Sequence, residues 1–284
     1  MHKQPYEGMK IIYYDIQLDD EFPVYYFKYV QKYKDFHKLH YHNSFEIGLC
    51  LEGSGMFFIE NRALSFNTCD ISFIYPNQPH IAQSPNELPS KWLYINVDFD
   101  GLFLDNGKMS TILWENKNQI PYIIHSNDNL VKIASIIADE LESKGQNYKL
   151  IIKELFHSFI YTLIRQAVKR DDNPFSLSEA YFSIAPALVY ISHNYHNDIS
   201  VTDLAKACNL SDAHFRLIFK NEIGCSPLQY LITVRMKMAK ILLKSTELPV
   251  LIIAQKVGYT SISSFNRAFK SHFNQTPTVY RVHE

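Results

Sequence analysis

The C-terminal third of this 284-residue chain contains one pattern twice. Residues 204–211 (LAKACNLS) correspond to residues 253–260 (IAQKVGYT) at an offset of 49 positions. After one inserted residue the offset becomes 50, and residues 215–220 (FRLIFK) then correspond to residues 265–270 (FNRAFK). A correspondence this detailed is not expected by chance, so we infer that one structural unit occurs twice in this region.

Each copy has the pattern of a helix, a tight turn and a second helix. A residue that tolerates a positive φ angle follows the first helix, Asn209 in one copy and Gly258 in the other. A side-chain hydroxyl is expected to cap the second helix, from Ser211 in the first copy and from Thr260 or Ser261 in the second. Residues suited to a left-handed C-cap end the second helices, namely Gly224 and Asn274. The pattern therefore predicts two helix–turn–helix motifs.

The second helix of each copy has an apolar face and an outer polar face. Helical spacing places four phenylalanines on the apolar face, where we expect them in the core: Phe215, Phe219, Phe265 and Phe269. It places eight residues on the outer face: Ala213, Arg216, Leu217 and Lys220 in the first copy, and Ser263, Asn266, Arg267 and Lys270 in the second. A helix–turn–helix puts its second helix in the DNA major groove, where Arg reads guanine and Lys neutralises phosphate. We predict that these eight residues contact double-stranded DNA. The alternative is a plain helical bundle with solvated basic side chains.

The distribution of charge agrees with that prediction. Residues 181–284 carry eleven Lys and Arg against six Asp and Glu, whereas the rest of the chain carries 17 basic against 23 acidic residues. A basic domain is typical of a polyanion binder, although an ordinary solvated surface would look the same. Between the copies, one amphipathic helix is expected from Leu228 to about Lys244. Such a rigid connector can hold two recognition helices about one DNA turn (~34 Å) apart.

The repeated motifs, together with Arg235, Gly258-Tyr259 and Thr276-Pro277, resemble the AraC/XylS family of bacterial transcription regulators over about residues 190–282. The resemblance implies a seven-helix DNA-binding domain and a cytoplasmic transcription regulator, in most members an activator. It also implies RNA polymerase as a partner and no enzymatic activity. By the same resemblance Arg216 and Arg267 are the best base-reading candidates. Leu217 stands where the second copy has Arg267, so the first recognition helix is expected to read fewer bases.

The N-terminal part, residues 1–126, has the pattern of short strands rich in aromatic and β-branched residues. Strands are expected within residues 11–14, 24–27, 45–49, 55–59 and 91–97, which suggests a sandwich or barrel. The run from His40 to Glu46 followed by Gly53 resembles the first cupin motif, and the run from Asp70 through Pro76 to His80 resembles the second. The expected fold class is therefore α+β in two domains, with a cupin-like β-barrel before the all-α DNA-binding domain.

Seven residues of this barrel are candidates for binding a small-molecule effector. His40, His42 and Glu46 share strand parity, and His80 would join them from a neighbouring strand if the fold closes. Trp92, Tyr94 and Asn96 alternate along another strand and offer stacking area and polar groups suited to a sugar. The histidines and the carboxylate could hold Zn, Fe or Mn, as in a metal-dependent cupin sensor or enzyme, or they could have a purely structural role. The sequence favours a metal-free ligand pocket, so no metal and no cofactor are expected.

Residues 127–170 have helical periodicity, with an apolar stripe wider than one neighbouring helix would cover. We expect a homodimer contact there, against the alternative of a helix pair packed only within the chain. The polar segment 171–182 is expected to be a linker, because Pro174 blocks helix continuation, and residues 183–284 form the DNA-binding domain. The chain has no apolar run long enough for a membrane span and no apolar segment typical of a signal peptide near Met1. Its four cysteines form no CxxC pair, which fits a reducing cytoplasm.

Overall fold

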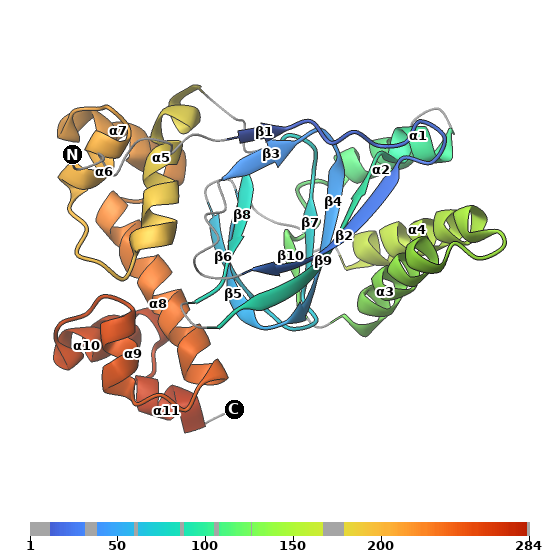
Figure 1. The fold of residues 1–284 in the computed structure, drawn as a ribbon. Helices are drawn as coiled ribbons and strands as arrows, with labels where there is room; N and C mark the ends of the chain where they lie inside the picture. Colours follow the sequence, from blue (N-terminus) through green and yellow to red (C-terminus); the bar gives the residue numbers. More distant parts are fainter. Residues whose placement is uncertain are drawn as a thin grey trace, which may run out of the picture.

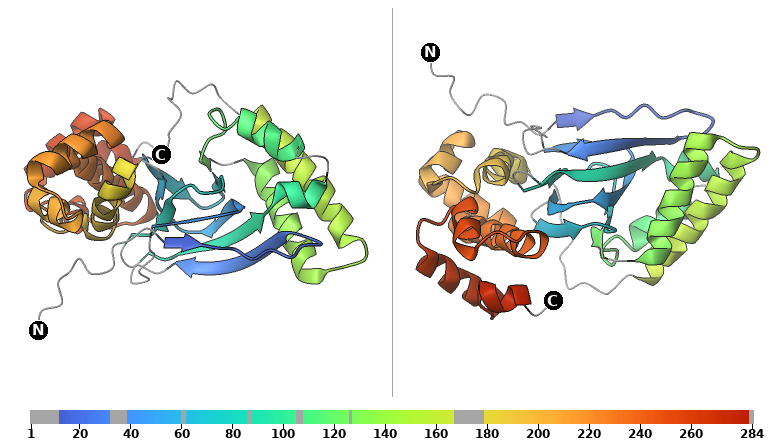
Figure 2. Two further views of the ribbon diagram at one scale, coloured as in Figure 1. Left: turned by 90° about the horizontal axis from the view of Figure 1, so that it is seen from above. Right: turned by 60° about the horizontal axis from the view of Figure 1, so that its bottom comes forward.

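The computed structural model describes residues 12–31, 39–59, 62–85, 88–104, 108–125, 127–166 and 179–282. It confirms the α+β class: a β-rich domain lies between a pair of helices on one side and a separate helical domain on the other (Figure 1). The two views of Figure 2 show the same three blocks side by side. No helix in the described ranges is both long and apolar enough to cross a membrane.

The β-rich domain contains two five-stranded sheets. The first sheet has the strand order β1 (Ile12–Tyr14), β3 (His40–His42), β8 (His80–Gln83), β5 (Ser54–Ile59) and β6 (Arg62–Asn67). The second sheet has the order β10 (Ile123–Ile124), β7 (Ile71–Ile74), β4 (Phe45–Glu52), β9 (Ser90–Val97) and β2 (Val24–Gln31). All strand pairs are antiparallel except β1 with β3. The pairs between described strands build two facing sheets and do not join them into one continuous ladder.

Strand parity sends alternate side chains of the second sheet into two different cores. On β4, Phe45, Ile47 and Leu49 belong to the cluster shared with α3 (Asp128–Ser143) and α4 (Tyr148–Arg165). Cys50 belongs to the cluster between the sheets. Two short helices, α1 (Phe99–Phe103) and α2 (Lys108–Glu115), follow β9. The sequence did not predict these two helices, because five and eight residues are too short to show clear helical periodicity.

The helical domain has the seven helices that the family resemblance implies. They are α5 (Glu179–Asn194), α6 (Val201–Ala207), α7 (Asp212–Ile223), α8 (Pro227–Ser245), α9 (Val250–Lys256), α10 (Ile262–Phe273) and α11 (Pro277–Val282). Most of the expected linker, residues 171–178, lies outside the described residues. Its last four residues are helical, because α5 already begins at Glu179. The helix begins earlier than expected because the Tyr181 side chain is fully buried in the core of the helical domain. The folded domain therefore includes residues that the sequence analysis assigned to the linker.

The turns of both motifs have the predicted backbone. Asn209 and Gly258 have φ angles of +55° and +88°. Gly224 and Asn274 end α7 and α10 in the left-handed region. Of the two candidate caps for the second copy, Ser261 is the one that accepts a hydrogen bond from the helix.

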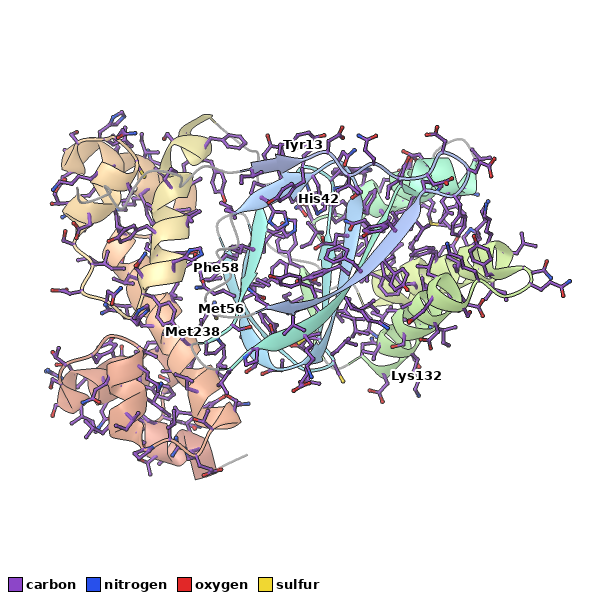
Figure 3. All side chains as sticks on the ribbon, in the orientation of Figure 1. Tyr13, His42, Met56, Phe58, Lys132 and Met238 are labelled. Carbon is purple, nitrogen blue, oxygen red and sulfur yellow. The ribbon has the colours of Figure 1, made fainter. Side chains whose placement is uncertain are left out.

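The helical domain packs directly on the outer face of the first sheet. Helix α8 contacts β5 and β6. Met56 and Phe58 of β5 lie in one apolar cluster with Met238 of α8, and Figure 3 shows these three side chains at the boundary between the domains. The Lys237 ammonium group also donates to the backbone carbonyl of Ala63. The first sheet is thus a single layer between the domain interior and α8.

Candidate nucleic-acid interface and internal pocket

The second helices of the two motifs, α7 and α10, begin and pack in the same way. The Ser211 hydroxyl accepts from the backbone N–H of His214, and the Ser261 hydroxyl accepts from that of Ser264, each at 3.4 Å. Four fully buried phenylalanine rings anchor these helices in the core: Phe215 and Phe219 on α7, and Phe265 and Phe269 on α10. The apolar face of each helix is therefore buried inside the domain, and the opposite face points outward.

The structure places seven of the eight predicted DNA-contacting residues on the surface. Those on α7 are all exposed, and those on α10 are exposed except Asn266: the set is Ala213, Arg216, Leu217, Lys220, Ser263, Arg267 and Lys270. Asn266 is half-buried, and its Oδ1 has no hydrogen-bond partner among the described residues. Leu217 is an apolar side chain that is 61% exposed. Both helices lie on the side of the domain away from the sheets (Figure 1).

Arg235 on α8 links the segment between α5 and α6 to the turn of the second motif. Its Nε donates to the Tyr195 carbonyl and its Nη2 to the Asn197 carbonyl, each at 2.7 Å. Its guanidinium group also lies over the Tyr259 ring, 5.7 Å from the centroid. A Cβ atom on Gly258 would come within 2.9 Å of the same guanidinium group. One side chain of the connector therefore contacts both the segment that follows α5 and the turn before α10. In the sequence, Arg235 was noted only as part of the family resemblance, and this positioning role was not predicted.

A cavity of about 420 Å³ lies inside the β-rich domain. Both sheets and the segment after β1 contribute to its lining: Tyr14, Asp15, Ile16, Phe27, Tyr29, Gln31, His40, His42, Glu46, His80, Ile81, Ala82, Tyr94 and Asn96. Six of the seven predicted effector-binding residues are in this set. The aromatic residues of β2 and the segment after β1 were not predicted, because neither carries a motif. Only the pairing of β2 with β9 and of β1 with β3 brings them to the cavity.

Trp92 is the predicted pocket residue that does not line the cavity. Its ring is fully buried and stacks on Tyr94 at 5.4 Å. Its indole N–H donates to the Ser90 hydroxyl at 3.0 Å. The expected strand face is correct, but Trp92 lies deeper along the strand, in the apolar cluster between the sheets. Trp92 thus packs against Tyr94 and positions that ring beside the cavity.

Three histidines and one carboxylate meet at one end of the cavity, and Figure 3 shows His42 between the sheets. His42 donates from Nδ1 to the Ser44 carbonyl at 3.0 Å, and His80 donates from Nδ1 to the Gln78 carbonyl at 2.8 Å; these hydrogen bonds assign the tautomers. Their Nε2 atoms lie 3.3 Å and 3.4 Å from the two Glu46 oxygens. Burial by itself would raise the pKa of Glu46. The charge of His80 and the close approach of both imidazoles to the carboxylate outweigh burial and hold the pKa of Glu46 well below its usual range.

Comparison with known proteins assigns a family to each domain. Residues 23–160 match the model of the AraC-like ligand binding domain. Residues 204–283 match a model described as a helix-turn-helix domain. The first match contains all seven predicted effector-binding residues, and the second contains all eight predicted DNA-contacting residues. Together the two models cover most of the chain.

Three curated relatives are transcription regulators by name. The lactose operon transcription activator of Staphylococcus xylosus is 32% identical over 157 residues, which cover 55% of this chain and 54% of that protein. The Msm operon regulatory protein of Streptococcus mutans is 24% identical over 245 residues, 84% of each chain. The raffinose operon transcriptional regulatory protein RafR of Pediococcus pentosaceus is 25% identical over 245 residues, 84% of this chain and 85% of that protein. The alignment thus spans about half the length of the first relative and most of the other two.

Proposed function

Because this chain belongs to the AraC family of transcription regulators, we propose that it binds double-stranded DNA in the cytoplasm and activates transcription in response to a small metabolite, a sugar. The observation that carries the proposal is the pair of recognition helices, α7 and α10. Each presents an exposed polar face that includes cationic side chains, and each is attached to the same connecting helix α8. The relatives' names support the regulatory role.

DNA recognition divides between base reading and phosphate contact. Arg216 and Arg267 project from the middle of α7 and α10, where a recognition helix is deepest in the major groove, and an Arg there bonds guanine O6 and N7. Lys220 and Lys270 lie one turn further along and neutralise phosphate. Leu217 offers an apolar contact to a thymine methyl group. The first helix therefore reads fewer polar base edges than the second.

The internal cavity is the site that we assign to the effector. Its volume of about 420 Å³ is within the range of small-molecule pockets. Phe27 and Tyr94, whose ring centroids are 5.3 Å apart, supply apolar surface for the face of a sugar ring. Asn96 lines the cavity, and its buried Oδ1 has no hydrogen-bond partner among the described residues, so a sugar hydroxyl could donate to it. The lactose and raffinose operons of two relatives' names support a sugar as the effector class.

The route from effector to DNA passes through the first sheet. Ile81 of β8 lines the effector cavity and also lines a small cavity shared with Tyr181 and Leu188 of α5. A ligand that moves β8 therefore changes the surface on which the helical domain rests. A difference in effector affinity between two such packings shifts their populations and hence the positions that α7 and α10 can take on DNA. RNA polymerase contact would follow from that placement.

We also propose that α4 contributes to a homodimer. Most of its apolar stripe is used inside the chain, since Ile152, Phe156 and Phe159 are fully buried. Ile151 and Tyr161 remain 39% and 51% exposed on the outer side. Analytical ultracentrifugation of the full chain tests this contact: Ile151→Asp should weaken self-association. Dissociation unchanged from that of the parent chain would contradict it.

The experiment for the effector is operator binding with and without sugar. Operator fragments are first selected from random DNA by the full chain, and Kd is then measured with lactose, raffinose and their monosaccharides. Phe27→Ala should raise the half-saturating sugar concentration by about fivefold, since an aromatic contact of this kind is worth about 1 kcal/mol. Val30→Ala is the matched control, because Val30 lies on the same strand but is exposed and outside the cavity. Operator affinity that no sugar changes would contradict a sugar effector.

A further inference from the structure

The histidine cluster of the cavity has the construction of a metal centre. We propose that His40, His42, His80 and Glu46 bind one divalent transition-metal ion. The role of that ion in sensing rests on the proposed function of the cavity, whereas its binding does not. The four residues come from three strands of the two sheets: His40 and His42 from β3, Glu46 from β4 and His80 from β8.

The four side chains hold their ligand atoms at the spacing of ligands that share one ion. One nitrogen from each histidine lies within 4.8 Å of the others. The Nε2 atoms of His42 and His80 lie 3.3 Å and 3.4 Å from the Glu46 oxygens. Two ligands at about 2.1 Å from one ion are roughly 3.0 Å apart in octahedral and 3.4 Å apart in tetrahedral geometry. The measured separations therefore match ligands that share an ion.

The two buried imidazoles, His42 and His80, are oriented as metal ligands are. Each donates its Nδ1 hydrogen to a backbone carbonyl, which leaves the Nε2 lone pair directed into the cavity. Metal-binding histidines are commonly held in this way, with the second ring nitrogen donating to a carbonyl or carboxylate. The sequence places both carbonyls two residues from the imidazole, at Ser44 and Gln78, so the ring orientation is built into the local chain.

Without a cation, the Nε2 atoms of His42 and His80 have no hydrogen-bond partner among the described residues. In the neutral tautomer, the lone pairs of two Nε2 atoms face a carboxylate that is 4% exposed. Neither Nε2 forms a hydrogen bond of normal geometry within the described residues. A charge-assisted N–H···O bond would be about 2.7–2.9 Å long, shorter than either contact here. One cation between these atoms would bind the lone pairs of both Nε2 atoms and the Glu46 carboxylate together.

The donor set also indicates the kind of ion. Three imidazole nitrogens and one carboxylate oxygen suit Zn²⁺, Fe²⁺, Co²⁺ or Ni²⁺ better than Mg²⁺ or Ca²⁺, which prefer oxygen ligands. His42 and His80 are buried, whereas His40 is only half-buried and lies next to Tyr14 at the edge of the site. The ion would thus be bound by side chains of both sheets and would face the rest of the cavity. An effector with oxygen donors could bind the ion from that side.

The test is a titration of the chelator-treated full chain with Co²⁺, followed by visible absorption and by elemental analysis after gel filtration. We expect one Co²⁺ per chain, with a d–d spectrum of nitrogen and oxygen ligation. Glu46→Gln and His40→Gln should each weaken binding by at least about tenfold. His125→Gln is the control, because His125 is exposed and pairs with Asp70 outside the cavity; it should bind Co²⁺ like the parent chain. Thermal melting shows whether each variant is folded. If Glu46→Gln does not fold, His40→Gln still tests the proposal.

Two results would overturn the proposal. One is the absence of stoichiometric Co²⁺ and Zn²⁺ in a folded parent chain. The other is binding that His40→Gln and Glu46→Gln leave unchanged while His125→Gln weakens it. Selective DNA binding without stoichiometric metal would refute this inference and leave the proposed function intact. Stoichiometric metal binding without selective DNA binding would support this inference and refute the proposed function.

Discussion

Replacing Arg267 by alanine separates base reading from every other part of the account. Arg267 is exposed in the middle of α10, so its removal should leave the fold and the melting temperature unchanged. One bidentate contact to guanine is worth about 1–3 kcal/mol of discrimination. Operator Kd should therefore rise by roughly 5- to 150-fold, and preference at one base position should be lost.

The assay is fluorescence anisotropy on the selected operator and on a panel of its single-base variants, at fixed salt because affinity depends on it. Lys108→Ala is the control, since Lys108 is also an exposed cation but lies at the start of α2 in the other domain, away from the proposed dimer contact. It should change neither affinity nor base preference. If Arg267→Ala weakens binding equally on every sequence, Arg267 contacts phosphate. If it has no effect, α10 is not a reading helix and the assignment of its outer face is wrong.

Three further predictions address phosphate contact, backbone geometry and pH. Lys270→Ala should weaken binding on all sequences and reduce the slope of log K against log salt by about 0.9, measured by salt titration; a changed base preference would contradict this. Gly224→Ala should lower the free energy of unfolding by about 1–2 kcal/mol because of its positive φ alone. Gly258→Ala should cost more, because its Cβ would also meet backbone and guanidinium atoms at 2.9 Å; equal costs in denaturant titrations would refute that. The hydrogen bond to Asp70 raises the pKa of His125, so that pair stabilises the fold fully below the ordinary value of 6.5 and loses its effect as pH rises through the higher folded value. His125→Gln should therefore flatten the decline in stability as pH rises above the ordinary value of 6.5, and an unchanged decline would exclude the pair as its source.

The helix–turn–helix motifs could be predicted in detail because their determinants are local. A positive φ at Asn209 and Gly258 and a hydroxyl cap at Ser211 each depend on residues within one turn of the chain. Duplication then let each copy support the interpretation of the other. The shared parity of His42 and Glu46 was equally local, since both lie on one short stretch of chain.

What the sequence did not reveal depends on contacts between distant segments. Trp92 has the parity of a pocket residue, but its depth is set by Phe66, whose ring packs 4.7 Å from it. Phe27 reaches the cavity only because β2 pairs with β9. The packing of α8 on β5 brings residues 56–58 into contact with residue 238. The hydrophobic periodicity of either segment does not indicate which segment it packs against.

The central claim is that one chain places α7 and α10 in successive major grooves of the same duplex. Methylation-interference footprinting on the selected operator measures this directly. Two clusters of guanines per chain, on one face of the DNA and about one helical turn apart, should block binding when they are methylated. Arg267→Ala should remove one cluster and Arg216→Ala should weaken the other. A single cluster that responds to both substitutions would contradict the account.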